Sequence, residues 1–126
     1  MGLVLDSGAL IAFERGDRGV AALIEVARRR RERVVTTSPC VAQAWRGDGA
    51  RQALLARLLQ GVHEYALDET VSRSVGALCA STGKVDVVDA HLALVAHDAD
   101  VVLTSDPGDI RAHLRRRGCT AQVERC

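Results

Sequence analysis

The stretch KVDVVDAHLALVAHDADVVLTSDPGDI, residues 84–110, gathers aspartates around two apolar segments. Asp86 suits the N-cap of a helix and Asp89 its first turn, where a carboxylate meets the positive end of the helix dipole. The apolar run 101–104 predicts a strand that ends just before Asp106. Because buried or half-buried carboxylates repel one another, this grouping predicts a site that holds a cation or moves a proton.

Outside this stretch the chain alternates short apolar runs with segments of helical spacing. The predicted strands cover 3–5, 34–36, 62–67, 101–104 and 120–123. The predicted helices cover 9–14, 17–33, 38–45, 50–59, 69–82, 86–96 and 108–117. Ser38 ahead of Pro39, and Asp68, read as N-caps, and Gly83 and Gly118 as helix ends. The alternation favours an α/β fold with a parallel sheet, right-handed crossovers and three layers.

Length and composition bound the kind of protein. The 126 residues correspond to one domain, 1–126, and 48% hydrophobic with 26% charged residues is typical of a globular chain with a real core. Aromatic residues are scarce, so the core is expected to be aliphatic and any nucleic acid to be held by charge rather than by stacking. The net charge of +1 predicts no strong steering of ligands by the whole molecule.

Cysteine, arginine and histidine patterns favour structural roles. The four cysteines form no CxxC pair, which indicates core residues or incidental thiols in a reducing cytosol. No N-terminal leader and no membrane-spanning run is present, so a cytoplasmic protein is expected. The arginine run 28–33 reads as a solvated helix end rather than an RNA-facing patch. His91 and His97 read as structural histidines with satisfied hydrogen bonds, since neither has a Cys or His at ligand spacing.

The aspartates suggest a metal site at one edge of the sheet. In a parallel sheet, ligands bind outside the carboxyl ends of the strands. Asp6 follows the first strand, Asp106 follows the fourth, and Asp89 can point into the same crevice. All-oxygen ligation suits Mg²⁺ or Mn²⁺, which lower the pKa of bound water and clamp a phosphodiester. Each aspartate also has a plainer interpretation as a helix cap or turn residue.

Four segments taken together resemble a PIN domain. They are an apolar strand into DSGALIAF (6–13), the helix of SPCVAQAWR (38–46), VVDAHLALVA (87–96) and VVLTSDPGDI (101–110). In size and layout the chain is similar to the VapC-type ribonuclease toxins of toxin-antitoxin pairs. The resemblance implies a parallel sheet in the order 3-2-1-4-5, a Mg²⁺ or Mn²⁺ site and endonucleolytic cleavage of RNA. It also implies a homodimer neutralised by a small antitoxin whose tail blocks the acidic cleft.

The resemblance also assigns residues to the site. The matching acids are Asp6, Asp89 and Asp106, with Asp109 and Asp86 as further candidate metal ligands. Ser7 and Thr104 match the small hydroxyl residues beside the first and last acids, and both are possible RNA contacts.

The chain departs from the family pattern at the second acid, where Gln43 stands in place of the usual glutamate. Glutamine keeps an oxygen ligand but removes a negative charge, which weakens metal binding and activation of water. Asp48 or Asp86 are possible substitutes for this charge. Arg46 and Arg51 are the arginines expected to contact phosphate, with solvated surface as the alternative for both.

Two further interpretations remain open. A PIN-like module that has lost turnover through Gln43 would bind RNA or a protein partner without cleaving it. A receiver or haloacid-dehalogenase-like phosphatase also places an aspartate after the first strand. The phosphatase, however, needs a second aspartate where this chain has Gly8, and the receiver needs adjacent acids.

Overall fold

The computed structural model describes residues 1–47 and 49–126, and all of these except Arg51 with their side chains. In chain order the elements are β1 (Gly2–Leu5), α1 (Ser7–Glu14), α2 (Arg18–Arg29), β2 (Arg33–Thr37), α3 (Ser38–Ala44), α4 (Gly49–Leu59), β3 (His63–Tyr65), α5 (Glu69–Thr82), α6 (Val87–Val95), β4 (Val101–Thr104), α7 (Pro107–Arg117) and β5 (Gln122–Arg125).

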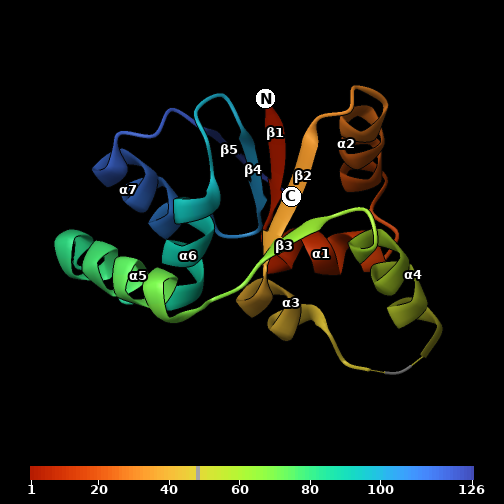
Figure 1. Ribbon diagram of the computed structural model, residues 1–126. Helices are drawn as coiled ribbons and strands as arrows, with labels where there is room; N and C mark the ends of the chain where they lie inside the picture. Colours follow the sequence, from red (N-terminus) through yellow and green to blue (C-terminus); the bar gives the residue numbers. More distant parts are fainter. Residues whose placement is uncertain (48) are drawn as a thin grey trace.

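The strands form one five-stranded sheet in the order β3-β2-β1-β4-β5, and every pair of neighbours is parallel (Figure 1). The predicted α/β class, the parallel sheet and the strand order are therefore confirmed. In the register of β1 and β4, Leu5 lies opposite Leu103. The residues that follow, Asp6 and Thr104, are thereby brought together at the carboxyl edge of the sheet.

Helices cover both faces of the sheet. α5, α6 and α7 pack against one another on one face, and α1 packs with α2 and α4 on the other (Figure 1). All four residues of β1 are buried, as expected for a central strand covered on both sides. The core is aliphatic, as predicted; its largest fully buried apolar side chains are Leu5, Leu10, Ile24, Leu55, Leu58, Leu92, Leu103 and Ile110.

Two local predictions are wrong. Thr37, not Ser38, caps α3: Thr37 is extended, and its hydroxyl accepts a hydrogen bond from the Cys40 amide at 3.3 Å. The Ser38 hydroxyl donates instead to Glu64. The last strand lies at 122–125 rather than 120–123, since the amide of Thr120 donates to Asp98 ahead of the strand.

A partly buried ion pair closes the amino end of the sheet. Arg33, the first residue of β2, contacts the carboxylate of Asp100, whose side chain is only 2% exposed. Arg33 also donates to the Val95 carbonyl at 3.0 Å, and Asp100 accepts from the His97 amide at 2.8 Å. The pair thus joins β2 to the loop that leads from α6 into β4.

The arginine run 28–33 was predicted to be a solvated helix end, which is correct for residues 28–31 but wrong for Arg33, because α2 ends at Arg29 and Arg33 begins β2 and pairs with Asp100. Arg28 donates to the carbonyl of Leu58 at 3.3 Å, and Arg29 pairs with Glu25 on the same helix at 3.1 Å. Of the described helices, none has the length and apolar character that crossing a membrane requires.

Candidate functional site

Asp6 is the fixed centre of the candidate site. It follows β1 as the N-cap of α1 and is 5% exposed. Its Oδ1 accepts from the Ser7 amide at 2.7 Å and from the Cys40 thiol at 3.4 Å, and its Oδ2 accepts from the Thr104 hydroxyl at 2.5 Å. Donors from α1, α3 and β4 therefore hold this carboxylate in one orientation, and Oδ2, which accepts from a single donor, keeps a lone pair for a ligand.

Gly8 lets the start of α1 lie directly against the loop that follows β4. A Cβ atom at Gly8 would stand 2.3 Å from the hydroxyl oxygen of Ser105 and 3.0 Å from its backbone nitrogen. Only a residue without a side chain fits there. The glycine of the Asp6-Ser7-Gly8 sequence thus keeps Asp6 close to the loop that carries Asp106.

Thr104 links two of the predicted acids. While its hydroxyl donates to Asp6, the same oxygen accepts from the backbone amide of Asp106 at 3.1 Å. Asp106 occupies the N-cap position of α7, but its side chain makes no capping hydrogen bond. The capping interpretation therefore does not account for this aspartate, and its exposed carboxylate is available at the carboxyl edge of the sheet.

Asp89 lies half-buried in the first turn of α6, as predicted. Burial, and after it the negative charges of neighbouring carboxylates, together raise the pKa of Asp89 from 3.8 to about 7. Those neighbours, in decreasing order of effect, are Asp86, Asp6, Asp109 and Asp106. The structure therefore brings all five predicted acids into one electrostatic cluster.

The two auxiliary acids have other contacts as well. Asp86 caps α6 through the amide of Asp89 at 3.0 Å, as predicted from the sequence. Asp109, in the first turn of α7, lies 3.7 Å from the ammonium group of Lys84. The only lysine of the chain thus offsets part of the negative charge at the rim of the cluster.

The donor set is that of a hard divalent cation, since it consists of carboxylates and hydroxyls. The raised pKa of Asp89 reflects burial first and the gathered negative charges second, and a bound dication would offset both by favouring the charged carboxylate. Across residues 1–47 and 49–126, no three His, Cys, Asp or Glu side chains are arranged to hold a metal ion as they stand. Metal binding would therefore require side chains to move, with Asp6 as the fixed point.

Cys40 is a site residue that sequence reasoning missed. It is fully buried in α3, and burial with the charge of Asp6 raises its pKa to about 12, so the thiol stays protonated and can donate to Asp6. Gln43 lies three residues further along α3 and is exposed. Residues three apart lie on the same side of a helix, so the predicted site position at Gln43 was a signal that Cys40 could also lie near the site.

Of the two arginines expected to contact phosphate, the structure describes the side chain of Arg46 only. Arg46 is exposed just after α3, and its guanidinium donates to the Trp45 carbonyl at 2.9 Å. The Gln52 side chain accepts from the amides of Arg46 and Gly47, which braces this turn. Asp48 and the side chain of Arg51 lie outside the described part of the chain.

His91 does not fit the prediction of a satisfied structural histidine. It is fully buried in α6, but neither ring nitrogen has a hydrogen-bond partner among the described residues. His97, by contrast, is exposed.

Comparison with known proteins leaves the chain without an assigned family, since neither a family model nor a curated protein matches it.

Proposed function

We propose that this protein is a metal-dependent endoribonuclease that hydrolyses RNA phosphodiester bonds at the cluster of Asp6, Asp89 and Asp106. The observation that supports it is the raised pKa of Asp89, to about 7, next to a second carboxylate fixed by donors from three residues. Such a concentration of acids at the carboxyl edge of a parallel sheet is costly for stability and suits a binding site.

The acids of the cluster would bind the metal, and the residues around them would position the acids and the RNA. Asp6, Asp89 and Asp106, with Asp109 and Asp86 at the rim, would hold Mg²⁺ or Mn²⁺. Bound there, the cation would supply a water of lowered pKa and a counter-charge for the phosphodiester. Thr104 and the backbone amide of Ser7 keep the Asp6 carboxylate in place. Arg46 follows α3, the helix that carries Cys40 and Gln43, and is a candidate for a phosphate contact.

The choice of RNA rests on the resemblance to PIN domains. The confirmed strand order agrees with that resemblance. The resemblance extends the proposal to the toxin component of a toxin-antitoxin pair. On this proposal the protein acts in the cytoplasm as a homodimer, and a small antitoxin neutralises it by covering the acidic cleft. A short neighbouring reading frame that encodes such an antitoxin would support this assignment.

The proposal is tested by incubating structured RNA with the purified protein and Mn²⁺. Cleavage is expected, with a loss of about 10²-fold or more in Asp6→Asn and in Asp89→Asn. Asp17→Asn is the matched control, since Asp17 is a carboxylate that caps α2 and is not among the charges that raise the pKa of Asp89. If Asp6→Asn and Asp89→Asn both cleave as fast as Asp17→Asn, the protein is not this kind of nuclease.

Gln43 supports a second candidate function, a PIN-like module that binds RNA or a protein partner with little or no turnover. The exposed amide at this position adds no charge to the cluster. The variant Gln43→Glu separates the two. A nuclease limited by metal affinity gains activity and needs less Mn²⁺ in this variant, whereas a binding module keeps RNA affinity in Asp6→Asn and shows no cleavage at saturating Mn²⁺.

A further inference from the structure

A pocket of about 330 Å³ lies between the start of α5, the second half of α6 and the end of β3. Its lining consists of Tyr65, Ala66, Thr70, Val71, Ser74, His91, Leu94, Val95 and His97. His91 comes two residues after Asp89, so the two side chains leave α6 on opposite sides. The pocket is therefore separate from the acidic cluster but shares a helix with it.

His91 is the unusual residue of this pocket. It is 0% exposed, and both of its ring nitrogens lack a partner among the described residues. Buried polar atoms without a partner are rare, because each costs about 1–3 kcal/mol of desolvation. The imidazole is thus a hydrogen-bonding group beside a pocket, and no described protein group uses it.

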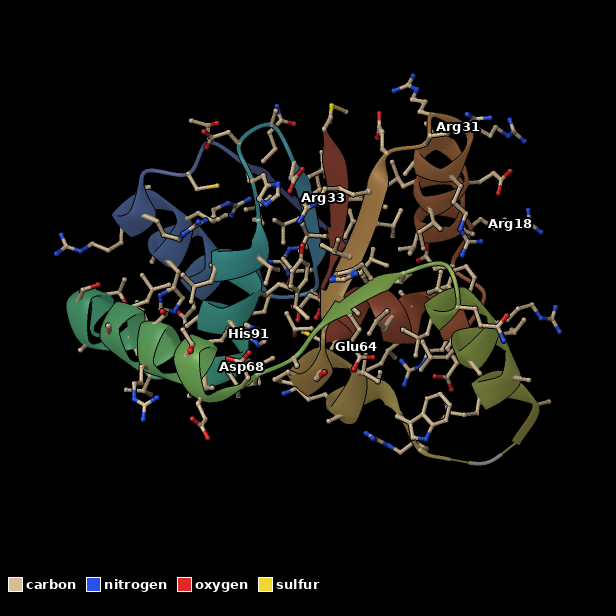
Figure 2. All side chains as sticks on the ribbon, in the orientation of Figure 1. Arg18, Arg31, Arg33, Glu64, Asp68 and His91 are labelled. Carbon is tan, nitrogen blue, oxygen red and sulfur yellow. The ribbon has the colours of Figure 1, made fainter. Side chains whose placement is uncertain are left out.

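The two ring nitrogens of His91, unpartnered among the described residues, determine which chemical groups of a ligand could bind beside it. Figure 2 shows His91 close to Asp68, at the junction of α6 and α5. A neutral imidazole carries one donor and one acceptor, so its natural partner is a neutral group that offers one of each.

The rest of the lining selects against charged ligands. None of its nine residues is Asp, Glu, Lys or Arg, whereas the other four described cavities each include at least one such side chain. Val71, Leu94 and Val95 supply apolar surface, and Tyr65, Thr70 and Ser74 supply hydroxyls. Its volume is near the lower end of small-molecule sites, which span roughly 300–1,000 Å³.

We propose that this pocket binds a single nucleobase, with its donor-and-acceptor edge toward His91 and its ring faces against the aliphatic side chains. A base combines a flat apolar body with adjacent donors and acceptors, whereas a partner's amide side chain would leave the aliphatic surface uncovered. The choice of RNA as the source of this base rests on the proposed function. The pocket would then give a nuclease a grip on RNA that charge alone does not supply.

The test is an NMR titration of the metal-free protein, selectively labelled at histidine Cε1, with adenosine, cytidine and uridine up to about 5 mM. We expect a saturable shift of the His91 signal, with a Kd of about 1 mM for at least one nucleoside. His113 is an internal control, because it is equally buried and lines none of the described cavities.

Two variants of α5 locate the binding. Ser74→Trp places an indole over the pocket from an exposed position and is expected to weaken nucleoside binding about tenfold or more. Ser72→Trp makes the same exchange at an exposed residue outside this pocket and should leave binding unchanged.

Absence of a His91 shift with all three nucleosides, or equal binding by both variants, would overturn the inference. Neither result bears on metal-dependent cleavage, which is measured separately, so failure here is distinct from failure of the proposed nuclease.

Discussion

Thr104→Val is the most informative single change at the acidic site. The Thr104 hydroxyl is fully buried between β1 and β4, where it donates to Asp6 at 2.5 Å and accepts from the Asp106 amide at 3.1 Å. Valine has nearly the same shape but lacks the hydroxyl, so the variant removes both hydrogen bonds with little change of packing.

The expected loss follows from the two bonds. A hydrogen bond to a charged group contributes about 1.5–3 kcal/mol, and the amide bond, beside an exposed residue, about 0.5–1 kcal/mol. The free energy of unfolding should therefore fall by about 2–4 kcal/mol. Since Asp6 also loses a donor that orients it, its affinity for Mn²⁺ should fall about 10-fold or more.

The assay is urea unfolding monitored by circular dichroism, with Mn²⁺ binding followed by calorimetry. Thr36→Val is the matched control, because Thr36 is equally buried in β2 but donates to the Leu5 carbonyl at 2.6 Å, a neutral acceptor. It should cost about 1 kcal/mol and leave metal affinity unchanged. If Thr104→Val costs no more than Thr36→Val, the Asp6 carboxylate is not held in the way argued above.

Three further predictions concern charge. Arg33→Met leaves the buried Asp100 carboxylate unpaired and should cost about 3–5 kcal/mol in urea unfolding. Arg29→Met, at an exposed pair, should cost less than about 1 kcal/mol, and equal losses would contradict the argument. In metal-free protein at about pH 8, Asp89→Asn should raise the Tm by removing repulsion. Mn²⁺ at a hundredfold excess over Kd should increase the free energy of unfolding of the parent protein by about 2.7 kcal/mol, and Asp89→Asn should abolish this increase. If the increase persists in the variant, the metal binds elsewhere. Burial lowers the pKa of His91 and of His113, so the unfolded chain binds more protons below pH 6.5. Stability should therefore fall as the pH drops below that value, and His113→Gln should reduce the slope by up to about 1.4 kcal/mol per pH unit, whereas an unchanged slope would mean that His113 is protonated in the fold.

The fold was predictable because each element carries its own signal. The apolar strand 101–104 and the capping of the preceding helix, α6, by Asp86 appear in the structure as expected. The start of α3 was misassigned, because Thr37 and Ser38 are both good caps and only the extended backbone of Thr37 decides between them. Such choices depend on tertiary contacts, here the hydrogen bond from Ser38 to Glu64 on β3.

The site was predictable in its acids but not in its supporting contacts. Aspartates after parallel strands converge by topology alone, so Asp6 and Asp106 could be placed without coordinates. The thiol of Cys40 could not, since a lone cysteine in a helix reads as a core residue until its distance to Asp6 is known. The unpartnered state of His91 is likewise a property of packing, which no sequence pattern records.

The difference between fixed and free carboxylates indicates how the acidic site would work. Asp6 is buried and held by donors from three residues, whereas Asp106 is exposed and its side chain makes no capping bond. Asp89 lies between these extremes, half-buried with a pKa of about 7, so it is only partly ionised near neutral pH. A cation entering this cluster would meet one preorganised ligand and would draw the others in by favouring their charged forms.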